Sequence, residues 1–226
     1  MPDEALVFGA SGQLGSAVAH RLENDDVTVV RATRAETEEP GWLSLAGDWW
    51  SNLEARRFDR IVWAQGINAS GSVRESSGQQ VRELLDANVV FVVDTVRVLL
   101  AADAIRPGAA LVVVSSIWQE TSRQDKLAYS VSKSAVAGLV RSLALDLGSA
   151  GIRVNAVLPG PVEGPLTRAF MSTEQIDAFT EGSPLSRLVT ADEVAEACAF
   201  LTGSTSSGIT AQSLVVDGGW TSVRRV

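Results

Sequence analysis

A tyrosine and a lysine stand four residues apart in this sequence, as Tyr129 and Lys133. The chain contains a single tyrosine and 19 basic residues, of which only two are lysines. On a helix, side chains at positions i and i+4 lie on one face, and a cation beside a phenol favours the phenolate. We therefore expect Lys133 to lower the pKa of Tyr129 from its ordinary value of ~10 and to make it a candidate general acid or base. A boundary tyrosine beside a solvated lysine is the alternative, and the neighbouring residues decide between the two.

Strand-like apolar runs alternate with helical patterns along the chain, and this alternation predicts where the pair lies. It indicates an α/β fold: a doubly wound parallel sheet of about seven strands, in a single domain spanning residues 1–226. Ligands of such sheets bind beyond the carboxyl ends of the strands. Residues 161–185, which contain several prolines, are expected to form a mobile lid over that edge. The expected strands cover residues 5–9, 27–32, 60–63, 109–115, 153–158 and 213–216, and the expected helices cover 13–23, 48–57, 78–104, 127–148, 173–181 and 191–201.

Composition excludes several classes of protein. The formal net charge of −8 argues against a nucleic-acid or membrane-surface role. One cysteine and one histidine offer neither an intrachain disulfide nor a metal cluster. No basic stretch followed by an apolar core opens the chain, and no run of 18 apolar residues occurs. We expect a cytoplasmic protein that acts on a small molecule and binds no metal.

A glycine-rich turn follows the first expected strand and opens the first expected helix. Glycines at this point let the backbone turn tightly and approach a pyrophosphate, and the helix start offers free N–H groups to the anion. An ordinary tight turn is the alternative. The candidate cofactor-binding residues of this turn are Gly9, Ser11, Gly12, Gln13, Leu14 and Gly15.

The end of the second expected strand indicates which dinucleotide binds. A site for the free ribose hydroxyl usually has Asp or Glu at this point, whereas this chain has Thr33 followed by Arg34. A guanidinium suits the 2′-phosphate of NADP. The pattern favours NADP(H) over NAD(H), the alternative being that Arg31 and Arg34 are solvated loop charges.

Two polar residues lie where chemistry would need them. Ser116 follows the buried run of the strand over residues 109–115, so it lies at the ligand-binding edge. Asn88 interrupts an apolar stripe of helical spacing. It is either a core asparagine with its hydrogen bonds satisfied or a local helix distortion that holds a water for proton relay.

With these residues in place, the sequence resembles the short-chain dehydrogenase/reductase family, in its single-domain branch, and is similar to bacterial 3-oxoacyl-carrier-protein reductase-like ketoreductases. The resemblance runs nearly end to end. It depends on the serine 13 residues before Tyr129, the Tyr-x-x-x-Lys pair, Asn88, and three further segments. These are residues 155–162 (NAVLPGPV), residues 184–195 (PLSR followed by ADEVA) and residues 215–219 (VVDGG).

The resemblance implies a Rossmann fold with a catalytic tetrad of Asn88, Ser116, Tyr129 and Lys133. Tyr129 would exchange a proton with the substrate oxygen, Ser116 would position that oxygen, Lys133 would bind the nicotinamide ribose and Asn88 would hold a water. The implied activity is an NADP(H)-dependent interconversion of a ketone and a secondary alcohol by hydride transfer. Further cofactor contacts are implied for Ala64, Gly66, Pro159, Gly160 and Val162.

Three departures from the family pattern concern the cofactor loops. The middle glycine expected at position 13 is Gln13, the usual Asn-Asn-Ala-Gly appears as residues 63–66 (WAQG), and the acidic residue expected near the adenine is Leu45. They leave room for a catalytically silent dinucleotide-binding or sensing protein, and for an epimerase or dehydratase on the same fold.

Expectations for the substrate and the oligomeric state come from the resemblance to the family. Ile117, Trp118, Gln119 and the lid would line the substrate pocket, and Trp118 and Phe170 suggest an apolar ketone. Family members usually form tetramers, with the helices over residues 78–104 and 127–148 at one interface and residues 215–226 at another. We expect a homo-oligomer, a tetramer or a dimer.

Overall fold

The computed structural model describes residues 3–37, 39–53 and 56–223. Seven parallel strands form one sheet in the order β3-β2-β1-β4-β5-β6-β7. The predicted doubly wound α/β fold in a single domain is therefore confirmed. The strands are β1 (Glu4–Phe8), β2 (Thr28–Thr33), β3 (Trp42–Ser44), β4 (Phe58–Trp63), β5 (Ile105–Val114), β6 (Arg153–Pro159) and β7 (Ser213–Val216).

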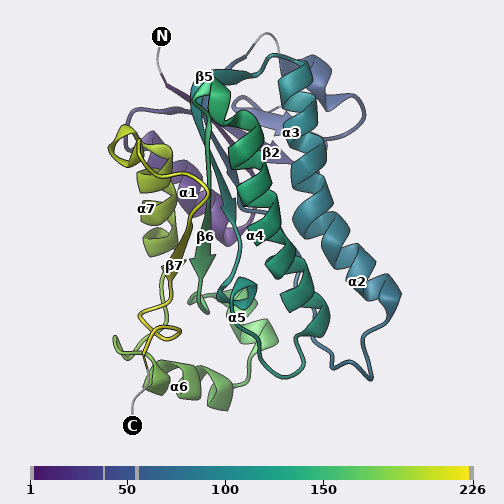
Figure 1. The fold of residues 1–226 in the computed structure, drawn as a ribbon, viewed down its shortest axis with the longest axis vertical. Helices are drawn as coiled ribbons and strands as arrows, with labels where there is room; N and C mark the ends of the chain where they lie inside the picture. Colours follow the sequence, from purple (N-terminus) through teal and green to yellow (C-terminus); the bar gives the residue numbers. More distant parts are fainter. Residues whose placement is uncertain (1–2, 38, 54–55, 224–226) are drawn as a thin grey trace.

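Helices cover both faces of this sheet, and two short ones lie beyond its carboxyl end. In Figure 1, α3 and α4 cross the near face, α1 and α7 lie behind it, and α5 and α6 lie below the arrowhead of β6. The helices are α1 (Gln13–Glu23), α2 (Gly78–Leu85), a π-helical turn (Asp86–Val90), α3 (Phe91–Ala101), α4 (Leu127–Leu147), α5 (Pro165–Phe170), α6 (Thr173–Gly182) and α7 (Ala191–Thr202).

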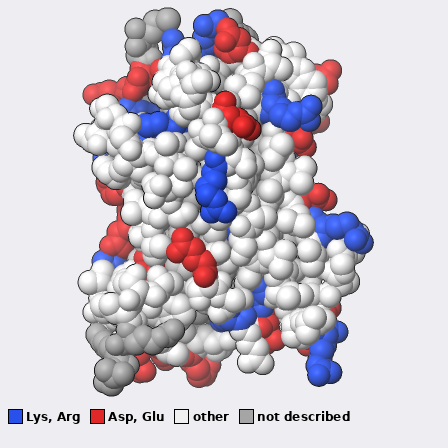
Figure 2. All heavy atoms as spheres, viewed as in Figure 1, with Lys and Arg blue, Asp and Glu red and all other residues white. Residues whose placement is uncertain are grey.

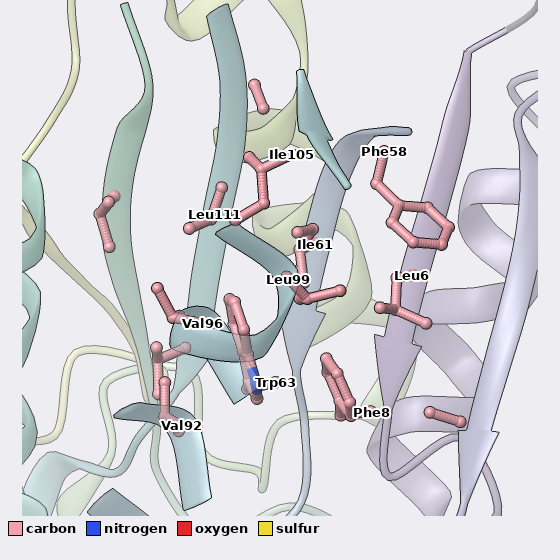
Figure 3. Close-up of a cluster of buried hydrophobic side chains, with 14 of the residues drawn as sticks. Leu6, Phe8, Phe58, Ile61, Trp63, Val92, Val96, Leu99, Ile105 and Leu111 are labelled. Atoms are coloured by element: carbon pink, nitrogen blue, oxygen red, sulfur yellow. The ribbon is translucent and has the colours of Figure 1, made fainter. Parts of the chain in front are cut away.

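Two apolar clusters hold these layers together. On the near face, Phe8, Trp63 and Leu111 of the sheet pack against Val96 and Leu99 of α3. Figure 3 shows these side chains converging between the strands and the helix. On the other face, α1 and α7 pack on the sheet through Val18, Leu22, Val194 and Cys198. Because β1, β4, β5 and β6 are buried on both sides, their sequences are nearly continuous apolar runs.

Several elements differ from the sequence-based expectation, among them one helix and one edge strand. The helix expected over residues 48–57 is only a 3₁₀ turn at Trp49–Leu53, with residues 54–55 outside the described part. The edge strand β3 was not predicted, because three residues are too few to show a period of two. Its register comes from pairing with β2, in which Trp42 lies beside Arg31.

The order of the strands produces the crevice that positions the site. β1 pairs with β2 on one side and with β4 on the other, so the connections leave β1 in opposite directions. The loops after β1 and β4 diverge at this point, and ligands of open α/β sheets bind there. Among the described residues, no helix is long and apolar enough to cross a membrane.

Candidate active site

A cavity of about 830 Å³ opens at the carboxyl ends of the strands, next to the point where the strand order reverses. Its size suits a small-molecule site. Most of the predicted site residues line it: Gly9, Ser11, Gly12, Gln13, Leu14, Thr33, Arg34, Ala64, Gly66, Ser116, Tyr129, Pro159, Gly160 and Val162. Gly15, Asn88 and Lys133 are buried behind this lining.

Two glycines of the turn after β1 leave no space for a side chain. Gly9 has a φ of +78°, and a Cβ there would lie 2.7 Å from the backbone nitrogen of Gln65. A Cβ at Gly15 would lie 2.2 Å from the carbonyl oxygen of Gly9. The turn is therefore packed tightly between the start of α1 and the loop after β4. Its backbone lines the cavity at the helix N-terminus, where N–H groups favour an anion.

Gln13, which replaces the family's middle glycine, contacts the segment expected to form a lid. Its Nε2 donates a hydrogen bond to the backbone carbonyl of Glu163, at 2.6 Å. Gly164 follows, and a Cβ there would lie 2.2 Å from Oε1 of Gln13. The two sides of the cavity mouth are thus joined at position 13.

The end of β2 presents one free cation to the cavity. Arg31 pairs with Glu23 at 2.7 Å and belongs to the surface of α1 and β2. Thr33 and Arg34 both line the cavity, with Leu45 beside them. Arg34 is exposed, and within the described part of the chain no carboxylate lies within ion-pair distance of it.

Tyr129 lies in the first turn of α4 and faces the cavity across from Ser116. Burial raises the pKa of Tyr129 to about 12, and hydrogen bonding with Ser116 offsets part of this rise. The sequence-based prediction of a pKa below the ordinary value is therefore wrong, because burial of the phenol raises the pKa. Tyr129 is therefore protonated at neutral pH and suited to donate a proton.

Lys133 lies one turn further along α4 and is 4% exposed. Its Nζ donates a hydrogen bond to the carbonyl of Val114 at 3.3 Å and lies 5.7 Å from the centroid of the Tyr129 ring. Burial lowers the pKa of Lys133 to about 8. Two ionisable groups are thus held beside each other, a phenol with a pKa of about 12 and an amine with a pKa of about 8.

Asn88 occupies the π-helical turn between α2 and α3. Its Nδ2 donates to the Ile67 carbonyl at 3.1 Å and to Oγ of Ser132 at 2.9 Å, and its Oδ1 accepts from the Ile67 nitrogen at 2.9 Å. The amide thus fastens the loop after β4 to α4. Both sequence-based interpretations contain part of this result: the side chain is satisfied by protein groups, and the helix is distorted at this residue.

Gly66 lies against this network. A Cβ there would lie 2.8 Å from Oδ1 of Asn88 and 3.5 Å from Nζ of Lys133. The glycine is required because the loop after β4 passes directly over both side chains. The replacement of the usual loop sequence by residues 63–66 (WAQG) keeps this glycine.

The loop after β6 forms the opposite wall. A Cβ at Gly160 would lie 2.9 Å from Cβ of Asp217, so this loop and the turn after β7 approach closely. The carbonyl of Val162 accepts a hydrogen bond from the hydroxyl of Thr167 in α5. This bond ties the start of the segment 161–185 to its first helix.

The substrate end of the cavity differs in part from the prediction. Trp118 lines it, but Ile117 and Gln119 do not. Ile117 is 1% exposed, and Gln119 donates to Oγ of Ser213 at 2.8 Å, because the 3₁₀ turn directs only the middle residue to the cavity. Arg123 and Lys126 line the cavity as well and were not predicted. The sequence held one signal for them, since Lys126 is the second of the two lysines and precedes Tyr129 by three residues.

These residues fit a dinucleotide. The glycine turn brings backbone N–H groups and a helix N-terminus to the cavity, and Arg34 supplies an unpaired cation where the second strand ends. Two cavity-lining side chains, Gln65 through Oε1 and Ser115 through Oγ, present buried oxygens that lack a partner within the described chain. Polar atoms of this kind call for a polar ligand.

Comparison with known proteins identifies the family. The sequence profile described as enoyl-(acyl carrier protein) reductase matches residues 51–221. The uncharacterized oxidoreductase YmfI of Bacillus subtilis (strain 168) is 36% identical, over 97% of this chain and 99% of its own length. Glucose 1-dehydrogenase of Gluconobacter oxydans (strain 621H) is 41% identical, over 96% of this chain and 91% of its own length.

A solved structure agrees with these matches. A short chain dehydrogenase family protein from Francisella tularensis subsp. tularensis SCHU S4 superposes with a TM-score of 0.88 at 27% identity, covering 99% of this chain and 100% of that chain. The chain therefore belongs to the short-chain dehydrogenase/reductase family of oxidoreductases, whose members use a nicotinamide dinucleotide.

Proposed function

We propose that this protein is an NADP(H)-dependent oxidoreductase that interconverts a ketone and a secondary alcohol. One observation carries the proposal: Tyr129 and Ser116 face one cavity together with the glycine turn, while Lys133 lies directly behind them. A proton donor, an orienting hydroxyl and a dinucleotide site thus share one space. Such an arrangement is what carbonyl reduction needs.

In this proposal each side chain has a defined task. Ser116 orients the carbonyl oxygen, and the phenol of Tyr129 donates the proton that this oxygen takes up. Lys133, with a pKa of about 8, resupplies the phenol at neutral pH. The nicotinamide supplies the hydride when bound. Asn88 holds the loop after β4 against α4, so that Lys133 keeps its position.

The position of Arg34 favours NADP(H). The guanidinium lines the cavity at the end of β2 and lies within ion-pair distance of no described carboxylate. A 2′-phosphate would pair with it. Leu45 beside it offers nothing to a free ribose hydroxyl.

Turnover with a panel of ketones tests the activity. Consumption of NADPH, with the matching alcohol as product, supports the proposal, and binding of NADPH without consumption by any ketone contradicts it and favours a sensing role. Tyr129→Phe should keep cofactor affinity and lose roughly 10²–10⁴-fold in turnover. Ser142→Ala, which removes an exposed hydroxyl further along the same helix, serves as the control.

We also propose a homo-oligomer, a tetramer, in the cytoplasm. Apolar side chains stand exposed on α3 and α4, among them Leu100 at 43%, Val131 at 43% and Leu145 at 82%. Figure 2 shows few charged groups across the middle of the face that carries these helices. The tail expected at a second interface ends at residues 224–226, which lie outside the described residues. Sedimentation of the protein and of Leu145→Asp tests the first interface, since Leu145→Asp should lower the assembly state.

A further inference from the structure

The charges around the cavity differ from those of the protein as a whole. The chain carries a formal net charge of −8. Yet three cationic side chains line the cavity, Arg34, Arg123 and Lys126, and among the residues that the structure describes no aspartate or glutamate does. Arg34 lies at the end of β2, where the dinucleotide is proposed to bind. Arg123 and Lys126 lie at the other end, in the loop that leads into α4 and Tyr129.

Lys126 is a buried cation without a counter-ion. It is 3% exposed, and its Nζ donates to three neutral oxygens of the loop after β4, on Asn68 at 3.0 Å, Ala69 at 3.2 Å and Ser70 at 3.1 Å. The same Nζ lies 5.7 Å from the Tyr129 ring centroid and 5.5 Å from that of Phe170. Both of the chain's lysines therefore flank the proposed acid. Burying a charge in this way is costly unless an opposite charge offsets it.

Arg123 brings a second positive charge to the same place. Its guanidinium lies 5.9 Å from the Trp118 ring centroid, and its Nε is buried without a hydrogen-bond partner. Within the described part of the chain neither Arg123 nor Lys126 forms an ion pair. The carboxylates nearest in sequence, Glu120 and Asp125, are exposed.

The two cations also repel each other. Burial and, after it, the charge of Arg123 lower the pKa of Lys126 to about 8. Held together without an anion, the pair destabilises the charged form of the lysine. A purely structural link between the loops would be made as well by a neutral amide, which has no such cost. The pair is therefore arranged for an anion that enters the cavity.

We propose that the substrate is an oxo acid, or the corresponding hydroxy acid, whose carboxylate binds Arg123 beside Lys126 while its carbonyl meets Tyr129. This inference rests on the proposed function for the carbonyl and adds the class of substrate. Arg123 makes the direct contact, because its Nε–H has no partner and a guanidinium matches a carboxylate with two parallel bonds. Lys126 contributes charge, since its three donors already bind neutral oxygens. Because only one guanidinium is free there, a singly charged carboxylate fits better than a phosphate dianion.

The first experiment compares acids with their own esters. The ketones are 4-oxopentanoate, 5-oxohexanoate and 6-oxoheptanoate, each beside its methyl ester, and the readout is kcat/KM with NADPH. We expect at least one acid to exceed its ester by about tenfold or more, because a charge-assisted bond is lost in the ester. The chain length at which this preference is largest reports the span from Tyr129 to Arg123. Esters reduced as well as or better than the acids would overturn the inference and leave the reductase activity intact.

Three variants locate the effect. Arg123→Gln should lose about tenfold to a hundredfold for the preferred acid and stay within about twofold for its ester. Arg123→Lys should recover part of this loss, since it restores the positive charge but not the two parallel hydrogen bonds of the guanidinium. Arg74→Gln removes an equal charge from an exposed position outside the cavity and should change neither substrate. An equal loss for acid and ester in Arg123→Gln would show a structural role only and contradict the inference.

A binding measurement tests the carboxylate site without turnover. Calorimetry with NADP⁺ present compares cyclohexanecarboxylate with cyclohexanecarboxamide, which has nearly the same shape and no charge. We expect the carboxylate to bind about tenfold or more tightly, and Arg123→Gln to abolish the difference. Equal affinities would refute the oxo-acid site even in an active reductase. A carboxylate preference without reduction of any ketone would instead refute the proposed function and retain the anion site.

Discussion

Gln13 and Glu163 are 150 residues apart in the chain and are joined by a hydrogen bond of 2.6 Å from the side-chain amide to the backbone carbonyl. Gln13 lies in the turn after β1, and Glu163 lies at the start of the segment expected to close over the substrate. The next residue, Gly164, has a φ of +156° and leaves room for the Gln13 amide. The glycine that the family usually has at position 13 could not make this contact. The departure from the family pattern therefore anchors the segment to the cofactor turn.

Gln13→Ala should loosen the segment 161–171 without unfolding the protein. A hydrogen bond of this kind contributes roughly 0.5–1.5 kcal/mol, so opening of the segment should become about twofold to tenfold more frequent. Amide hydrogen exchange of peptides covering these residues measures the opening. Gln79→Ala is the control, because the side-chain hydrogen bonds of Gln79 join it to Arg82 and Glu83 of its own helix, far from the cavity mouth. Equal exchange in Gln13→Ala and the parent would show that the bond does not restrain the segment.

Gly66→Ala should lower both the activity and the stability of the protein. The added methyl group would lie 2.8 Å from Oδ1 of Asn88 and so displace the amide that holds Ile67. The Nζ of Lys133 lies 3.5 Å from the same point, so the methyl group would reach it at ordinary contact distance. We expect a loss of at least about tenfold in kcat, together with about 1–3 kcal/mol in the free energy of unfolding from the disturbed buried amide.

A matched glycine serves as the control for this substitution. A Cβ at Gly208 meets nothing within 4 Å and its φ is not in the left-handed region, so Gly208→Ala should leave both kcat and the urea midpoint unchanged within error. If Gly66→Ala retained full kcat, the close packing of the loop against Asn88 and Lys133 would not be needed for activity.

The sequence predicted the elements that show strong periodicity. It could not predict an element that is defined only by its pairing with another strand. The helix Gln13–Glu23 and the strand Ser213–Val216 were bounded correctly, because a stripe or an apolar run ends at each boundary. The edge strand Trp42–Ser44 was missed, because its pairing with β2 defines it and its own three residues do not. Periodicity in the sequence predicts helices and buried strands, whereas the pairing of a short edge strand depends on the rest of the fold.

The same limit explains the site. Spacing placed Ser116, Tyr129 and the glycine turn at one cavity, because motifs at strand ends meet at one edge of a parallel sheet. The direction of the Tyr129 pKa could not be predicted, because it depends on how much water the finished fold removes from the phenol. Arg123 and Lys126 were missed for a related reason. Their lack of counter-ions is a property of the assembled cavity and not of the neighbouring residues in the chain.

Arg34→Asp should reverse the preference between the two dinucleotides. The substitution removes the cavity's cation at the end of β2 and adds a carboxylate, which accepts bonds from a free ribose hydroxyl and repels a 2′-phosphate. We expect affinity for NADPH to fall about tenfold or more and affinity for NADH to rise. Titrations that follow the fluorescence of each reduced cofactor measure both constants. Arg31→Gln is the control, since Arg31 pairs with Glu23 outside the cavity, and an unchanged preference in Arg34→Asp would show that the end of β2 does not select the cofactor.

The two directions of the reaction should respond oppositely to pH. Lys133 has a pKa of about 8 and is charged below that value, whereas Tyr129, with a pKa of about 12, stays protonated across the same range. Reduction consumes a proton through Tyr129, so its kcat should be full below pH 8 and fall as Lys133 loses its proton above that value. Oxidation returns a proton and should rise over the same interval. Rates measured in both directions from pH 6 to 10, corrected for stability of the reduced cofactor, test this, and Lys133→Arg, which cannot lose its proton, should flatten both curves. Curves that keep their shape in Lys133→Arg would exclude Lys133 as the group that titrates.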